Sequence, residues 1–178
     1  MTLPDEVSKI CLNAEGKGRV TRKKSRGSFS FESTYTLKAW TLGLYFPGKE
    51  KVIRLEKQKS GQYDVLKYGS FPIKYKAELQ KLMSFLEKSK TGQLSCKIES
   101  RNKFYQGNCS EIPISGKLGD HFQVRLSEDP LVYLKASGPS ESFFKKISLT
   151  IGNTSLYSDP EFHLELYVDQ CVKLKLEK

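Results

Sequence analysis

The sequence predicts a mainly β fold: an antiparallel β-sandwich or barrel of about nine strands, with one inserted α-helix at about residues 73–88. Ten Phe and nine Tyr against a single Trp favour strands over helices. Apolar and polar residues alternate through most of the chain, and Gly, Pro, Asn and Ser separate the alternating runs. A parallel sheet would need regular helical crossovers, whereas only one segment has helical spacing, so we expect an antiparallel sheet.

The first half of the chain predicts four strands. In the first of them, apolar residues of one parity alternate with polar residues of the other, which is typical of a strand with one buried face. The apolar set is Phe29, Phe31, Tyr35, Leu37 and Ala39. Residues 42–46, 52–56 and 63–68 then predict three shorter strands, with turns at Pro47-Gly48 and Ser60-Gly61.

The predicted helix has one apolar face. Its apolar residues are spaced i, i+3, i+4 and i+7, the spacing of one side of an α-helix: Leu79, Leu82, Met83 and Leu86. Pro72 suits the first turn, and Gly92 lies just past the end. We expect this face to pack against a sheet or to close one end of a barrel; a partner-binding helix is the alternative.

The second half of the chain predicts strands again. Residues 93–99 and 103–110 form an expected hairpin, and residues 121–126, 131–136 and 143–151 predict three more strands. The last run has the clearest alternation, and Gln170 interrupts it, which predicts a β-bulge near that residue. Its apolar residues of one parity are Phe162, Leu164, Leu166, Val168, Val172, Leu174 and Leu176.

The four cysteines predict two disulfides. If residues 93–110 form a hairpin, Cys96 lies opposite Cys109, and Cys11 is left to pair with Cys171. The first bridge closes a short loop and would stabilise the fold by roughly 3 kcal/mol. The first residues show no signal peptide, which fits a cytosolic protein or an exported one that has lost its signal. Disulfides favour export to the periplasm or the extracellular space, whereas four reduced, buried thiols would fit the cytosol.

The composition is that of one globular domain, residues 1–178. A chain of 178 residues with 38% hydrophobic residues can build a real core, and it is too apolar for a disordered protein. No run approaches the roughly 18 apolar residues of a membrane span. The net charge of +10 favours anionic partners without choosing among them.

A basic segment at residues 16–27 is the strongest functional signal in the sequence. It contains six cations and no acid, between glycines: Lys17, Arg19, Arg22, Lys23, Lys24 and Arg26. We expect a mobile loop or a hairpin tip. Such a cluster can neutralise phosphates or sulfates, which would make these residues an anion-binding site; a solvated loop without a partner is the alternative.

No motif predicts an enzyme, a cofactor or a metal centre. Residues 43–49 match the spacing of a phosphate-binding loop, but their interior is bulky and Glu50 stands where a hydroxyl is needed. Glu161, His163 and Glu165 share one face of a strand, which is also what any solvent-facing strand presents. We therefore expect no catalytic residue, no bound metal and no cofactor.

Three functions from different classes remain. The first is an exported, non-catalytic binding or structural domain that contacts an anionic envelope polymer or a protein partner. The second is a carrier of a small apolar ligand, a closed β-barrel with the helix as its lid, which an interior cavity would identify. The third is a cytosolic nucleic-acid-binding protein, which requires reduced cysteines and salt-sensitive binding.

Overall fold

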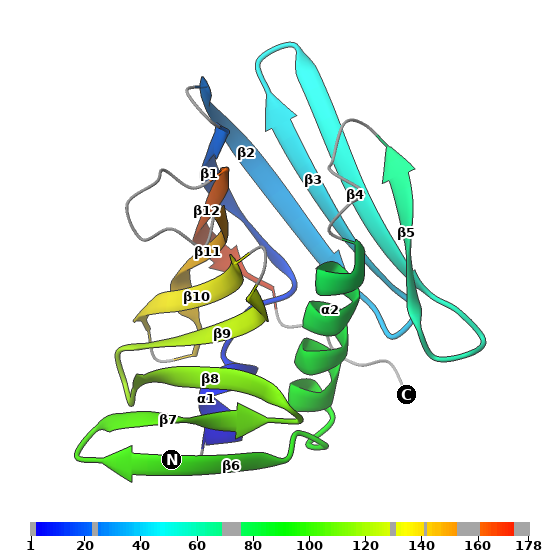
Figure 1. The fold of residues 1–178 in the computed structure, drawn as a ribbon. Helices are drawn as coiled ribbons and strands as arrows, with labels where there is room; N and C mark the ends of the chain where they lie inside the picture. Colours follow the sequence, from blue (N-terminus) through cyan, green and yellow to red (C-terminus); the bar gives the residue numbers. More distant parts are fainter. Residues whose placement is uncertain are drawn as a thin grey trace.

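The computed structural model describes residues 3–22, 25–68, 76–128, 131–140, 142–152 and 161–172. Within these residues, twelve strands form one antiparallel sheet, in the order β5-β4-β3-β2-β1-β12-β11-β10-β9-β8-β7-β6. The sheet is open, and it curves around helix α2, whose bounds are Lys76–Lys90 (Figure 1). Mainly β architecture, as the sequence predicts, is confirmed; a sandwich or a closed barrel is not.

The chain enters the sheet near its middle, runs to one edge, and returns from the opposite edge. After α1 (Leu3–Ser8), five strands run outward to one edge, the other seven run inward from the opposite edge, and β12 pairs with β1. The outward strands are β1 (Ala14–Arg22), β2 (Ser25–Tyr35), β3 (Ala39–Phe46), β4 (Lys49–Lys57) and β5 (Tyr63–Tyr68). The inward strands are β6 (Cys96–Arg101), β7 (Phe104–Cys109), β8 (Ile112–Lys117), β9 (His121–Glu128), β10 (Leu131–Pro139), β11 (Phe144–Gly152) and β12 (Phe162–Cys171).

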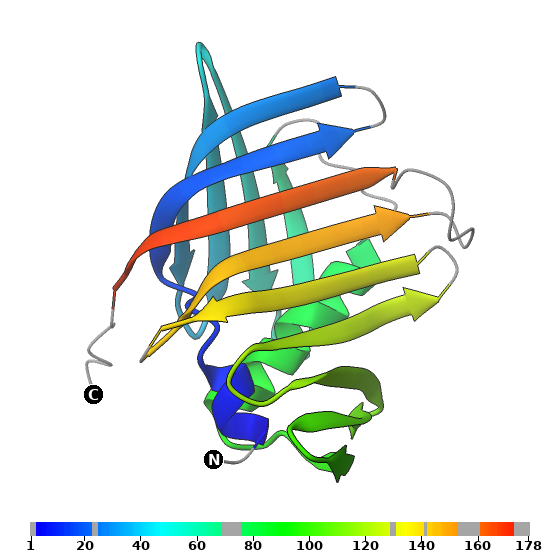
Figure 2. The same cartoon turned by 90° about the vertical axis from the view of Figure 1, so that its left-hand side faces the viewer.

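Helix α2 lies in the connection between the two edge strands β5 and β6. Its 15 residues span about 22 Å at 1.5 Å per residue. The helix passes across the concave face of the sheet, so one face of the sheet packs against α2 and the other faces solvent (Figure 2). This arrangement explains the period-2 alternation in the sequence, because each strand has one face of each kind.

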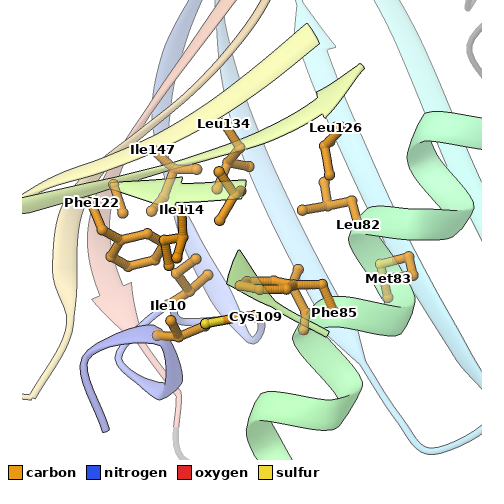
Figure 3. Packing of buried hydrophobic residues seen from close by; sticks show 14 of the residues in the cluster. Ile10, Leu82, Met83, Phe85, Cys109, Ile114, Phe122, Leu126, Leu134 and Ile147 are labelled. Carbon is orange, nitrogen blue, oxygen red and sulfur yellow. The ribbon is translucent and has the colours of Figure 1, made fainter. Parts of the chain in front are cut away.

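The core on the concave face consists of two hydrophobic clusters. The first joins α1, α2, β4, β5 and the strands β7 to β11, and Figure 3 shows Leu82 and Phe85 of α2 among Leu126, Ile114 and other sheet residues. The second lies on β1 to β4 and β12 and contains these buried residues: Ala14, Phe29, Phe31, Leu42, Leu44, Ile53, Leu164 and Val168. The division of the core into two clusters leaves space between them.

Of the two forms expected for residues 16–27, the structure agrees with the hairpin and not with a long loop. Residues 16–22 belong to β1 and residues 25–27 to β2, and the two strands pair as far as Arg22 and Ser25; Lys23 and Lys24 lie outside the described residues. The expectation of a loop rested partly on Gly18, because glycine is common in turns. A Cβ atom at Gly18 would lie 2.5 Å from ring atoms of Phe29, so glycine here marks a strand covered by a neighbouring aromatic ring and not a turn.

The other differences from the prediction are smaller. The count of about nine strands is too low because β1 and β8 went unrecognised, and helix α1 was not expected. Strand β2 ends at Tyr35, and Leu37 is exposed. The bulge near Gln170 is confirmed: the β1–β12 register shifts between Glu15 and Gly16, beside that residue. Residues 173–178, expected in the last strand, lie outside the described residues.

Both cysteine pairs lie at disulfide distance, in the pairing that the sequence predicts. The S–S distances are 2.03 Å for Cys11–Cys171 and 2.02 Å for Cys96–Cys109. Cys96 and Cys109 are directly opposite each other in the β6–β7 hairpin. The Cys11–Cys171 bridge ties the segment after α1 to the end of β12. No helix among the described residues has the length and apolar character needed to cross a membrane.

Candidate ligand-binding site

A narrow apolar cleft lies between α2 and the concave face of the sheet. It has a volume of about 90 Å³, and both hydrophobic clusters contribute to its walls. Leu79, Leu82, Met83 and Leu86 line it from the helix. The strand residues that line it include Phe31, Leu42, Ile53, Leu134, Ile147, Leu164 and Val168. The walls are almost entirely aliphatic and aromatic, so the cleft suits an apolar group and not a polar one.

Polar contacts at one side hold α2 over this cleft. Glu87 of α2 forms a salt bridge with Lys57 and accepts a hydrogen bond from the hydroxyl of Tyr63, with an O–O distance of 3.1 Å. The pKa of Lys57 is raised because its ammonium bonds to the Glu87 carboxylate. Gln80 donates to the Tyr63 carbonyl at 2.5 Å. These bonds join α2 to the β4–β5 side of the sheet.

The end of α2 is joined to the N-terminal segment by one lysine. Nζ of Lys90 donates to the carbonyl oxygens of Ser8 and Ile10, at 2.5 and 2.9 Å. Burial lowers the pKa of Lys90, and the two carbonyl dipoles stabilise its ammonium in this site. The position of α2 is thus set by polar contacts at its side and at its end, while its apolar face borders the cleft.

Trp40, the only tryptophan, also lines the cleft. Its indole N–H donates to Oγ of Ser33 at 2.8 Å, and Ser33 in turn donates to the Leu12 carbonyl at 2.7 Å. The polar atoms of Trp40 and Ser33 are therefore bonded within the protein, and the indole ring presents apolar surface to the cleft.

A wider basin adjoins the cleft on the part of the concave face formed by β1 to β4 and β12. Its volume is about 310 Å³. Ile53 and Leu164 line both the basin and the cleft, so the two spaces share one apolar wall. The floor of the basin consists of apolar side chains: Val20, Leu44, Phe46, Ile53, Phe162 and Leu164.

Phe46 and Gly27 shape the floor of the basin. The Phe46 ring packs against Phe29, with ring centroids 5.2 Å apart. Gly27 lies beside it in β2, where a Cβ atom would come within 3.3 Å of the Phe46 ring. The missing side chain at Gly27 leaves the face of the sheet open at this point.

Three cations line the basin on the same face as this apolar floor: Arg22, Lys49 and Lys51. Arg26 also borders the basin, but it is opposite Thr21 in the β1–β2 register and therefore belongs to the other face of the sheet. The strand register explains two of them, because Lys49 is opposite Phe46 and Lys51 is opposite Leu44, and directly paired residues share a face of the sheet. Arg22 is likewise opposite Phe162 in β12. Burial and the charges of Lys49 and Arg22 lower the pKa of Lys51.

The structure divides the predicted anion-binding residues between the two faces of the sheet. Arg22 lines the basin from the concave face, whereas Lys17, Arg19 and Arg26 belong to the solvent-facing side. On that side the Arg19 guanidinium lies 5.7 Å from the centre of the Tyr167 ring. Lys23 and Lys24 lie outside the described residues.

Lys49 and Lys51 were missed in the sequence. They follow the turn at Pro47-Gly48, and pairing the two strands across this tight turn would have placed both lysines beside Phe46 and Leu44.

The solvent-facing side of β11 and β12 holds a polar network. Nδ1 of His163 lies 2.7 Å from Oγ1 of Thr150, and Nε2 lies 3.0 Å from Oε1 of Glu165. The hydroxyl of Tyr167 donates to Oε2 of Glu165 at 2.6 Å. Both ring nitrogens of His163 are therefore engaged by protein groups. Within the described part of the chain, no group of three His, Cys, Asp or Glu side chains is placed to hold a metal ion.

Comparison with known proteins identifies no family. No protein-family model matches the sequence, and no curated protein matches it significantly. The basin and the cleft therefore have to be interpreted from their own geometry and chemistry.

Proposed function

We propose that this protein is a non-catalytic binding domain that holds an apolar, chain-like ligand on the concave face of its sheet. The observation that carries the proposal is the wall shared by the basin and the cleft, to which Ile53 and Leu164 both belong. A chain lying on the basin floor can continue beneath α2 without leaving apolar surroundings.

The size and lining of the basin support this proposal. Pockets for small ligands measure about 300–1,000 Å³ and are lined mainly by apolar side chains with a few polar groups. The basin, at about 310 Å³, is at the lower end of that range, and its floor is apolar. Burial of each methylene group from water contributes about 0.8 kcal/mol, so even a short chain would gain useful binding energy here.

The carrier expected from the sequence had a closed β-barrel, whereas the proposed ligand lies on an open sheet that curves around α2. In this arrangement α2 is a fixed wall of the site and not a lid, because contacts of Glu87, Gln80 and Lys90 hold it in place. The basic residues support contact with an anionic polymer or a protein partner less well, since they are distributed over both faces of the sheet.

We further propose that the domain works in an oxidising compartment, the periplasm or the extracellular space. Two cysteine pairs at disulfide distance support this placement. Alkylation of the denatured, unreduced protein from its native compartment tests it: no thiol should react. Reaction of all four cysteines would favour the cytosol and a nucleic-acid partner.

Binding of the neutral fluorescent probe N-phenyl-1-naphthylamine tests the proposed function. The probe should bind saturably to the wild-type protein with increased fluorescence, because it enters an apolar site. Val20→Trp places a large ring in the basin and should weaken binding at least fivefold. Thr21→Trp is the matched control, since Thr21 is the next residue on β1 and faces the other side of the sheet.

Absence of saturable probe binding to the wild-type protein would refute the proposed function. An equal loss of binding in the two tryptophan variants would move the site away from the basin. Thermal unfolding of both variants is measured first, because a tryptophan ring at either position can disturb the sheet. Their probe binding is compared only if their unfolding temperatures agree.

A further inference from the structure

We propose that the ligand is a single-chain amphiphile with an anionic head group, bound by Arg22, Lys49 and Lys51 with its chain on the basin floor. This inference rests on the proposed function and names the class of ligand. It follows from the placement of the cations, from the absence of Asp and Glu among the described residues that line the basin, and from the shape of the apolar space.

The cations lie on the same face of the sheet as the apolar floor. The Lys51 Nζ atom is 5.8 Å from the centre of the Phe46 ring, so a charged group and the apolar floor are in contact. Lys49 and Arg22 are opposite Phe46 and Phe162 in the strand register. A ligand on the floor therefore lies within reach of these charges. An amphiphile can use both features, because its chain contacts the floor while its anionic group pairs with the cations.

No acid balances these charges within the described residues. None of the basin-lining residues is Asp or Glu, and no carboxylate among the described residues forms a salt bridge with Arg22, Lys49 or Lys51. By contrast, the described Lys57 and Lys146 each have a carboxylate partner, Glu87 and Glu165.

The mutual repulsion of these cations agrees with the lowered pKa of Lys51, which burial and the neighbouring charges of Lys49 and Arg22 cause. An anionic head group would supply the missing countercharge, and charge-assisted hydrogen bonds to it are stronger than those between neutral groups.

The apolar space narrows away from the cations, which favours one chain over two. The cleft beneath α2 has about 90 Å³ and adjoins the basin at Ile53 and Leu164. A closed cavity of about 150 Å³ is enough for one benzene molecule, so the cleft admits the end of a single chain and not a ring system or a chain pair. The head group would thus lie at the cations and the chain end near α2.

Displacement of N-phenyl-1-naphthylamine by two ligands of equal chain length tests the inference. Decyl phosphate carries the anionic head group and 1-decanol does not; decyl phosphate is used below its critical micelle concentration and decanol below its solubility limit. We expect decyl phosphate to bind at least tenfold more tightly than decanol. We also expect added NaCl to weaken binding of decyl phosphate and to leave binding of decanol unchanged.

Two double variants with the same loss of charge locate the head group. R22Q/K51Q should weaken decyl phosphate at least tenfold and change decanol affinity by less than twofold. K17Q/R19Q removes two cations from the opposite face of the same region and should change neither affinity by more than twofold. Circular dichroism and thermal unfolding show whether the variants remain folded; the salt dependence of the wild-type protein tests the inference without any variant.

The outcomes separate the two proposals. If decanol and decyl phosphate displace the probe equally well, or if both double variants weaken decyl phosphate to the same extent, the head-group site is wrong and the apolar site stands. If neither ligand displaces the probe and the probe itself does not bind, the proposed function fails.

Discussion

The ammonium group of Lys51 lies 5.8 Å from the centre of the Phe46 ring on the concave face of the sheet. This ammonium is next to an aromatic floor and two further cations, Lys49 and Arg22. The same floor continues into the cleft beneath α2 through Ile53 and Leu164. The relationship between these groups is the basis of the proposed site.

Substitution of Gly18 should destabilise the sheet more than substitution of Gly27. A Cβ atom at Gly18 would lie 2.5 Å from the Phe29 ring and 2.6 Å from the Glu165 carbonyl oxygen, whereas at Gly27 the nearest atom is 3.3 Å away. We expect Gly18→Ala to lower the free energy of unfolding by about 2 kcal/mol and Gly27→Ala by less than about 1 kcal/mol. Urea denaturation measures both; equal effects would show that Phe29 does not cover Gly18.

The bridge between Cys96 and Cys109 should contribute measurable stability. It closes a short loop with a sequence separation of 13, for which the chain-entropy model gives about 3 kcal/mol. C96S/C109S should lower the free energy of unfolding by this amount under oxidising conditions. Under reducing conditions the two proteins should differ much less. An unchanged unfolding curve in oxidising buffer would show that the bridge does not form.

Tyr105 and Tyr63 should respond in opposite ways to loss of the hydroxyl. The buried Tyr105 hydroxyl has no hydrogen-bond partner among the described residues, and burial raises its pKa. Tyr105→Phe should therefore raise the free energy of unfolding by about 1 kcal/mol. Tyr63→Phe removes the hydrogen bond to Glu87 and should lower it by about 1–2 kcal/mol. Thermal and urea unfolding decide; destabilisation by Tyr105→Phe would mean that its hydroxyl is bonded.

The Glu165 carboxylate should make stability depend on pH at the acidic end. Hydrogen bonds from Tyr167 and His163, together with the charge of Lys146, lower its pKa from 4.5 to about 2. A group whose pKa is lower in the folded state stabilises the protein above its unfolded pKa and loses this effect as the pH falls through the folded value.

At pH 7, Glu165→Gln should therefore cost about 1 kcal/mol, and the difference from the wild type should shrink between pH 4.5 and pH 2. Urea unfolding across this range measures it. Glu99→Gln, at an exposed position of β6, is the control and should show no such trend. A difference that stays constant down to pH 2 would contradict the assigned hydrogen bonds.

Strand alternation and cysteine placement were readable in the sequence because both depend on local spacing. Phe162, Leu164 and Val168 face the core as their parity predicts, and the β6–β7 hairpin brings Cys96 opposite Cys109. Helix α2 was also readable: its buried face contains the four residues that the i, i+3, i+4, i+7 spacing selects.

The basin was not readable, because it depends on which strands are neighbours. Val20, Phe46 and Phe162 lie far apart in the sequence and meet only because β12 pairs with β1 and β3 lies one strand beyond β2. The density of charge in the basic segment is visible in the sequence, but it does not show on which face of the sheet each side chain lies. Its register with β12 separates Arg22 from Lys17 and Arg19, and the lysines that complete the cluster come from β4.

The central claim, that an apolar chain occupies the concave face, is tested most directly by quenching of the only tryptophan, Trp40, which lines the cleft. A bromine atom quenches tryptophan fluorescence on contact, so 10-bromo-1-decanol should quench Trp40 saturably, and unbrominated decanol should reverse the effect by competition. Saturable displacement of N-phenyl-1-naphthylamine by the brominated alcohol without quenching of Trp40 would place the ligand elsewhere and contradict the account.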